Sequence, residues 1–299
     1  MTGVQTCALP ISIPTANIHA LGLENEKPIH FAAYFTDNTE FINILLRAGA
    51  SLEAHDEYEE TPLFYAIRGK SPLLMARHLL ELGANPEAKN QEGETPFLHA
   101  VKNENIPLME ILRKFNTDVF AVDSHKTTAL HFASKYCTDK NCLQYLLDVG
   151  CDIHAKNDWG AVPIDFAGSN PSPEIPLDFF LAHGCQISKD AVYWGVVNKE
   201  YRYLQLLIEY RSEINPVCQY DQGYPLQTPL DWATQEYERI LKDMWPHKNA
   251  DEKEYGHFVQ NGETNSGKST IIKLISEELT TIESIINLLV DNGATRSNK

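Results

Sequence analysis

Apolar and polar residues follow one another along the chain in a repeating order that predicts pairs of short helices. Leu63 and Ala66 lie at helical spacing, and Leu79 and Leu80 form an apolar pair on one face of a second helix. A polar stretch, 90–94, separates this pair of helices from the next apolar segment. The pattern therefore predicts a unit of helix, turn, helix and polar link that recurs along most of the chain.

A four-residue motif marks the start of each predicted first helix. Its second position falls at residues 28, 62, 96, 129, 163 and 229, so the intervals are 34, 34, 33, 34 and twice 33. A Thr at the first position can cap a helix with its hydroxyl, and a Pro is tolerated at the second because its missing N–H would be unpaired there anyway. Side-chain caps are expected at Thr61, Thr95 and Thr228.

A second motif, Leu-Leu-x-x-Gly-Ala, keeps step with the first near the end of each second helix. It is found at 45–50, 79–84 and 146–151, one residue longer at 288–294, and as a looser copy that ends at 184–185. Its glycines are predicted to end these helices in the left-handed conformation: Gly49, Gly83, Gly150, Gly184 and Gly293. The third pair has Phe115-Asn116 in their place.

Together these motifs resemble the ankyrin-repeat family, whose unit is about 33 residues long with a T-P-L-H-x-A signature. The resemblance runs from about residue 16 to 294. It implies an all-α solenoid of stacked helix-turn-helix units with hairpin loops, since one helix pair cannot bury its apolar face alone. About seven pairs are predicted, at 27–50, 61–84, 95–116, 128–151, 162–185, 189–212 and 228–294.

Three segments depart from this plan. Residues 1–11 lack periodicity and look like the translation of a sequencing-library adapter, and 12–26 are interpreted as the remnant of a truncated preceding repeat. The array itself is assigned to 27–299. Its last repeat carries an insertion at about 236–280, predicted as a long helical hairpin with a polar tip at 246–268.

Net charge restricts the partners. The chain carries a charge of −16, and its Lys and Arg are scattered, so neither nucleic acid nor insertion into a membrane is expected. A protein partner with a basic surface fits this charge, although excess acid can simply keep an elongated protein soluble. The six cysteines form no CxxC, which favours an intracellular compartment; secretion as an effector stays open.

Residues 262–269 match the phosphate-binding pattern G-x-x-x-x-G-K-[ST], from Gly262 through Lys268 to Ser269. A true phosphate loop follows a buried strand and opens a helix within a βαβ unit, and that context is missing here. Nucleotide binding is therefore kept only as a remote alternative, and no cofactor or metal is expected.

Other chemistry-bearing residues have structural interpretations. The resemblance implies that His30 and His131 make structural hydrogen bonds, whereas His99 is one position out of phase and differs in role. Cys151 and Cys185 replace the Ala of Gly-Ala and are expected to be buried thiols. Cys137 and Cys142 flank a helix–helix turn and are expected to be exposed.

The resemblance implies a non-enzymatic scaffold, expected to be a monomer, that binds another protein through hairpin tips and the concave face of the first helices. The alternative is a targeting arm of a larger enzyme or effector whose catalytic domain lies upstream. Predicted contact residues at the tips are Glu57, Tyr58, Gln91, Glu92, Ser124, His125, Asp158 and Trp159. Those at the first-helix ends are Tyr34, Phe35, Arg68, Lys102, Lys135 and Tyr136. Tyr58 and Trp159 are the expected anchors, unless either ring folds onto a neighbouring hairpin.

Overall fold

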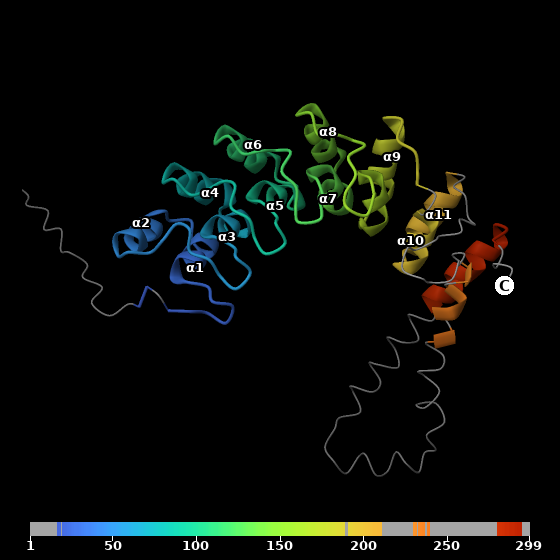
Figure 1. The fold of residues 1–299 in the computed structure, drawn as a ribbon, viewed down its shortest axis with the longest axis horizontal. Helices are drawn as coiled ribbons and strands as arrows, with labels where there is room; N and C mark the ends of the chain where they lie inside the picture. Colours follow the sequence, from blue (N-terminus) through green and yellow to red (C-terminus); the bar gives the residue numbers. More distant parts are fainter. Residues whose placement is uncertain are drawn as a thin grey trace, which may run out of the picture. The chain divides into compact units, whose positions relative to one another are not determined.

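Short helices joined by tight turns form the fold (Figure 1). The computed structural model describes residues 17–18, 20–188, 191–210, 230–231, 233–236, 238–239 and 280–294, without the side chains of residues 193, 194 and 197. Within these ranges every regular element is a helix, which confirms the predicted all-α class. The chain divides into two compact units, residues 1–126 and 127–299.

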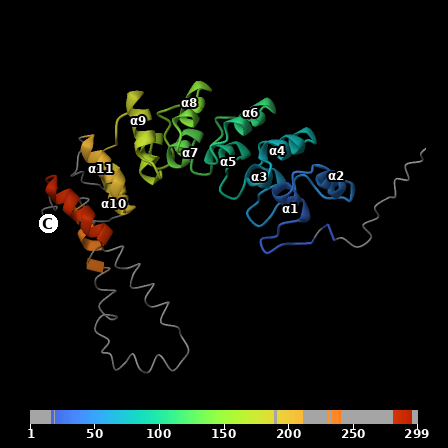
Figure 2. The same ribbon diagram turned by 180° about the vertical axis from the view of Figure 1, so that it is seen from behind.

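The first unit contains three helix pairs. First helices contact first helices, α1 with α3 and α3 with α5, and second helix α4 contacts α6. Figures 1 and 2 show these two rows from opposite sides. The helices are α1 (Pro28–Phe35), α2 (Glu40–Arg47), α3 (Pro62–Arg68), α4 (Pro72–Glu81), α5 (Pro96–Lys102) and α6 (Ile106–Lys114).

The predicted threonine caps differ from one repeat to the next. Thr95 accepts the backbone N–H of Leu98 at 3.4 Å, as predicted. The prediction is wrong for Thr61, whose buried hydroxyl has no hydrogen-bond partner. In the fourth pair the corresponding hydroxyl bonds the ring of His131, but Phe64 occupies that position in α3 and offers no polar atom. Thr228 lies outside the described residues.

Left-handed residues end the second helices where the sequence predicts them. The φ angles of Gly49, Gly83, Gly150, Gly184 and Gly293 lie between 81° and 100°. In the third pair, where this glycine is missing, Asn116 takes the same conformation with φ 61°. Asn tolerates the left-handed region better than most residues, so the turn survives the change.

The second unit continues with further helix pairs. Its elements are α7 (Ala129–Tyr136), α8 (Lys140–Asp148), the 3-10 helix η1 (Pro163–Ser169), α9 (Glu174–Ala182), α10 (Ala191–Val197) and α11 (Tyr201–Glu209). The first helix of the fifth pair is thus a 3-10 helix. Gly168 lies in it so close to the ring of Tyr203 that an added Cβ would meet ring carbons at 2.8 Å.

The predicted seventh pair is described only at its two ends. Helical residues are present at 230–231, 233–236 and 238–239, and again at 280–291. These lie in the predicted first and second helices. The predicted polar tip at 246–268, including Gly262 to Ser269, lies outside the described residues.

The buried core consists of the apolar positions that face neighbouring helices. Met75, Leu108 and Cys142 occupy equivalent second-helix positions, counted back from the left-handed residue that ends each helix, and are 0%, 0% and 1% exposed. The equivalent residue of the first pair, Phe41, is 53% exposed. One position in the repeat is therefore core in three helices and surface in α2.

This contrast predicts unequal costs for two matched substitutions. Met75→Ala leaves a cavity in the core and should lower the free energy of unfolding by about 2–5 kcal/mol. Phe41→Ala should cost less than about 1.5 kcal/mol, because much of its ring already contacts water. Urea unfolding of both variants, followed by helical circular dichroism, measures the difference; equal losses would contradict the packing described.

Candidate protein-interaction surface

An Asp or Asn side chain shapes each hairpin tip. The Asp56 carboxylate accepts the backbone N–H groups of Tyr58 and Glu60, both at 2.8 Å. Asn90 does the same for Glu92 at 3.1 Å and Glu94 at 2.9 Å. Such side-chain turns mimic a backbone turn and fix the residues between donor and acceptor.

The same device recurs at the next two tips. Asp123 accepts the N–H of His125 at 2.8 Å, and Asn157 accepts that of Trp159 at 3.1 Å. Each acceptor stands immediately before a predicted tip pair. Sequence reasoning missed these four residues, although their spacing of 34, 33 and 34 residues was a visible signal.

Neighbouring tips of the first unit are joined by backbone hydrogen bonds. Glu57 donates its N–H to Glu24 at 2.7 Å, Gln91 to Tyr58 at 2.9 Å, and Ser124 to Glu92 at 2.9 Å. Each bond joins equivalent places about 33 residues apart. The predicted tip residues of this unit therefore form one continuous row rather than separate loops.

A glycine permits close approach within this row. Gly93 has φ 76°, and an added Cβ would lie 2.7 Å from the backbone nitrogen of Ser124. That nitrogen makes the hydrogen bond to Glu92. The equivalent left-handed position is occupied by Glu59 in the preceding hairpin and by Gly160 in the second unit.

Both predicted aromatic anchors are exposed. The Tyr58 side chain remains 46% exposed, although its hydroxyl donates to Glu24 of the neighbouring hairpin at 3.3 Å. The negative charge of Glu24 raises the pKa of Tyr58. Trp159 is 66% exposed in the second unit. Neither ring is buried against a neighbouring hairpin.

Aromatic residues also gather at the end of α1. Tyr34 and Phe35 meet edge to face with ring centroids 4.7 Å apart, and Phe31 stacks on Phe35 at 6.3 Å. Phe31 was not among the predicted contact residues. In the second unit the Lys135 ammonium lies 5.2 Å from the centre of the Tyr136 ring.

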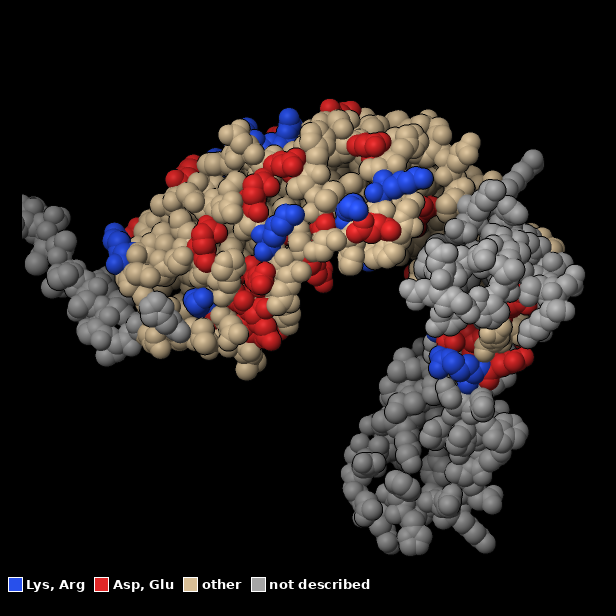
Figure 3. Space-filling model, viewed as in Figure 1, with Lys and Arg blue, Asp and Glu red and all other residues tan. Residues whose placement is uncertain are grey.

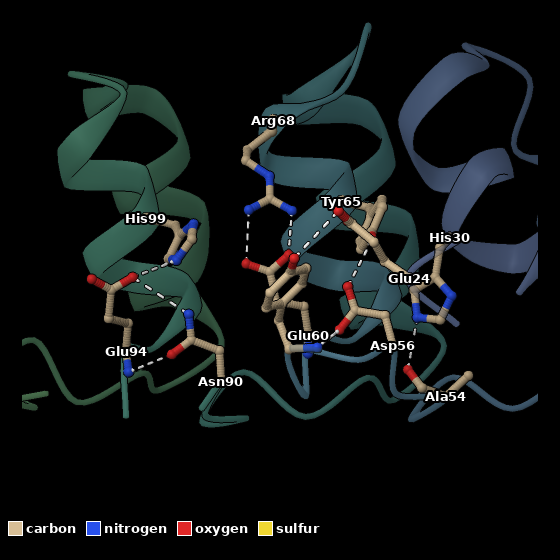
Figure 4. Close-up of polar contacts among 11 residues, drawn as sticks. Glu24, His30, Ala54, Asp56, Glu60, Tyr65, Arg68, Asn90, Glu94 and His99 are labelled. Atoms are coloured by element: carbon tan, nitrogen blue, oxygen red, sulfur yellow. Dashed lines mark hydrogen bonds and ion pairs between the residues drawn. The ribbon is translucent and has the colours of Figure 1, made fainter. Parts of the chain in front are cut away.

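The basic residues predicted in the first unit's contact face are held by carboxylates of that unit. Figure 4 shows the Arg68 guanidinium against both oxygens of Glu60, and the same guanidinium lies 5.3 Å from the centre of the Tyr65 ring. Tyr65 in turn donates to Asp56 at 2.7 Å. The turn-forming residue Asp56 therefore also anchors the first helix that follows it.

Glu94 holds two partners in the next repeat. Its carboxylate accepts from the His99 ring at 2.8 Å and forms an ion pair with Lys102 (Figure 4 shows His99). Burial alone would raise the pKa of Glu94, but the hydrogen bonds and positive charge of these partners outweigh burial and hold it at about 2. Lys102, a predicted contact residue, is thus half-buried and engaged within its own unit.

Acidic side chains dominate the loops of the first unit. The hairpin at 51–60 contains five acidic residues and no Lys or Arg. Figure 3 shows Asp and Glu gathered over the loops that link the helix pairs of this unit. With Arg68 and Lys102 paired to Glu60 and Glu94, the exposed tips present Glu57 and Glu92 to solvent.

The histidines of the first helices have structural roles, as the resemblance implies. His30 bonds the Ala54 carbonyl at 2.9 Å and accepts the N–H of Lys27 at 2.8 Å. His131 bonds the Ala161 carbonyl at 3.0 Å. His99 bonds a carboxylate instead, which confirms its different role. Across the described residues, no three His, Cys, Asp or Glu side chains are grouped to hold a metal.

The cysteine predictions divide. Cys151 and Cys185 are buried, as expected. The expectation that Cys137 and Cys142 are exposed is wrong, since both are buried. Cys142 is one of the buried residues of α8, and the carbonyl of Cys137 accepts a hydrogen bond from the buried side chain of Asn170.

Comparison with protein families gives two overlapping matches to "Ankyrin repeats (3 copies)", at residues 7–90 and 72–157. Together they span just over half of the chain. The chain belongs to the ankyrin-repeat family. Repeats of this family are generally protein–protein interaction modules and typically non-catalytic. No curated protein matches the chain. Among the described helices, none has the length and apolarity needed to cross a membrane.

The pKa of Glu94 predicts an acid-sensitive contribution to stability. A carboxyl with a folded-state pKa below its ordinary value of 4.5 stabilises the fold above that value, and the contribution disappears as pH falls towards 2. Glu94→Gln should therefore lower the unfolding free energy by about 2–3 kcal/mol at pH 7, and by about half as much at pH 3.

Urea unfolding of the wild-type chain and of Glu94→Gln at pH 7, 4 and 3 measures this effect. Glu92→Gln is the matched control, because Glu92 is exposed two residues away in the same hairpin. A Glu94→Gln deficit that stays constant with pH would contradict the ionic network.

Proposed function

We propose that this chain is a scaffold that binds another protein, with contacts made by the hairpin tips and the ends of the first helices. The observation that carries the proposal is the ordered row of tips. Asp56, Asn90 and Asp123 fix the three hairpins internally, and hydrogen bonds between hairpins tie their backbones together. A surface that is already ordered loses little conformational entropy when a partner binds.

Each unit presents an exposed aromatic residue as a proposed anchor. Tyr58 in the first unit and Trp159 in the second present large rings on backbones that are held by Asp56 and Asn157. Tyr and Trp are enriched among the residues that dominate binding energy, because they bury much area with few rotatable bonds. Tyr34 and Phe35 extend the apolar area at the end of α1.

The charge of the tips favours a partner with basic groups. Glu57 and Glu92 flank Tyr58 and Gln91 along the row, and the cations of the adjacent helices are paired internally. An acidic surface accelerates association with a basic one, and dissolved salt screens that attraction. We therefore propose an apolar contact at Tyr58 surrounded by Lys or Arg of the partner.

We also propose that residues 12–26 are the end of a further repeat. Gly22 donates to Glu26 at 2.8 Å, and the corresponding hairpin bonds in the next two repeats are Asp56 to Glu60 at 3.2 Å and Asn90 to Glu94 at 3.1 Å. The exposed Phe41 supports the same proposal, since the equivalent residues of the following pairs are buried.

Substitution of the two anchors tests the scaffold. Proteins are captured from cells on the immobilised wild-type chain and purified. Their affinities for the wild-type chain and for Tyr58→Ala/Trp159→Ala are then compared. Losing an aromatic anchor costs about 2 kcal/mol, so each purified partner should bind the double variant at least about 30-fold more weakly. Leu74→Ala is the control, because Leu74 is 49% exposed on α4, a second helix.

Association rates at low and high salt complete the test. For the proposed basic partner, the rate constant should fall as salt rises, and Glu57→Gln/Glu92→Gln should weaken that dependence. Partners that bind the anchor variant as tightly as wild type would overturn the proposal that the tips make the contact. An association rate constant that does not change with salt would overturn only the proposal that the partner is basic.

A further inference from the structure

Two cysteines lie side by side in the turn between α7 and α8. Cys137 follows the last residue of α7, and Cys142 lies in the first turn of α8. Their sulfur atoms are 2.8 Å apart, closer than the ordinary contact between two sulfurs, while a disulfide bond is about 2.05 Å long. Closing such a bond requires a movement of less than about 1 Å.

Hydrogen bonds hold both cysteines in place. The N–H of Cys137 donates to Ala133 at 2.9 Å, and its carbonyl accepts from the Asn170 side chain at 2.8 Å. That amide also donates to the Ser134 carbonyl at 2.8 Å. On the other side, the N–H of Cys142 donates to Asp139 at 3.2 Å. The contact between the two sulfurs is therefore part of the hydrogen-bonded structure of the turn.

The pair has no role in the proposed partner surface. Both thiols are buried, at 0% and 1% exposure, and are reduced in this structure. A single buried cysteine behaves as a small hydrophobic residue, but two sulfurs in contact offer a reaction that one cannot perform. Cys185, in the same unit, is an example of a single buried cysteine, and burial raises the pKa of its thiol.

We propose that Cys137 and Cys142 form a dithiol site that closes to an intramolecular disulfide on reaction with a small peroxide. One sulfur attacks the peroxide oxygen, the O–O bond breaks, and a sulfenic acid and one water form. The second sulfur then displaces the sulfenic hydroxyl as water and forms the S–S bond. Two thiols lose two electrons and two protons, and one hydrogen peroxide becomes two waters.

Burial restricts the oxidant. Hydrogen peroxide is small enough to reach buried sulfurs through minor openings, whereas a bulky disulfide oxidant must wait for the turn to unfold locally. The disulfide would link the end of α7 to the start of α8. Cys137 directly follows Lys135 and Tyr136, two of the proposed contact residues. The proposal does not depend on partner binding.

Peptide mapping of the full-length chain after peroxide treatment tests the site. Remaining thiols are alkylated, the chain is cut with trypsin without reduction, and linked peptides are identified by mass. The expected product joins peptide 136–140 to peptide 141–156, with the loss of two hydrogens, and dithiothreitol reverses it. Because peptide 141–156 also contains Cys151, fragmentation must place the link at Cys142.

Two variants sharpen the assignment. The link should vanish in Cys142→Ala and persist in Cys151→Ala, with circular dichroism confirming that each variant is folded. Three results would each overturn the proposal: a link that persists in Cys142→Ala, sulfinic acid at either cysteine without a link, or thiols that stay reduced under conditions that oxidise the urea-unfolded chain.

Discussion

The structure depends on one constraint: a pair of short helices cannot bury its apolar face without a neighbouring pair. Helices of 7 to 10 residues are too short to be stable alone in water, so packing between pairs supplies their stability. In the first unit this packing joins α1 to α3, α3 to α5 and α4 to α6. The exposed Phe41 and the fully buried Met75 show that a residue at one repeat position is core or surface according to the neighbour it has.

Stacking also sets the spacing of the hairpin loops. Their tips form the surface proposed for partner contact. Asp56, Asn90, Asp123 and Asn157 each fix a turn with a side-chain acceptor, so the tip residues are positioned before any partner arrives. In the first unit, backbone bonds between hairpins join the tips into a row. A rigid scaffold that presents ordered loops is a common basis for recognition.

Charged side chains near this surface form ion pairs that stabilise the fold. Glu60 with Arg68, and Glu94 with His99 and Lys102, link each hairpin to the first helix that follows it. These pairs withdraw the basic residues from solvent and leave the exposed acids of the tips to set the local charge. The proposed contact residues and the ionic network that stabilises the fold therefore lie in the same repeats, and a substitution at Glu94 tests the fold rather than the contact.

The sequence by itself determined the family, the phase of the repeats and the helix ends. Each of these depends on short-range chemistry: proline at a first helical position, glycine or Asn116 in the left-handed region, and apolar residues at helical spacing. The same phase located the tip pairs and assigned structural roles to His30 and His131. It could also have revealed the turn-forming Asp and Asn residues, which recur with it.

Only the tertiary structure decided what each side chain meets. The Thr61 hydroxyl has no hydrogen-bond partner although Thr95 at the same repeat position caps its helix, and Lys102 is held by the buried carboxylate of Glu94. Cys137 and Cys142 proved buried and in contact, contrary to expectation, and the side chain of Asn170 from the next repeat donates a hydrogen bond to the Cys137 carbonyl. A periodic pattern specifies spacing along the chain, but it does not specify which side chains face each other within a turn or between neighbouring repeats.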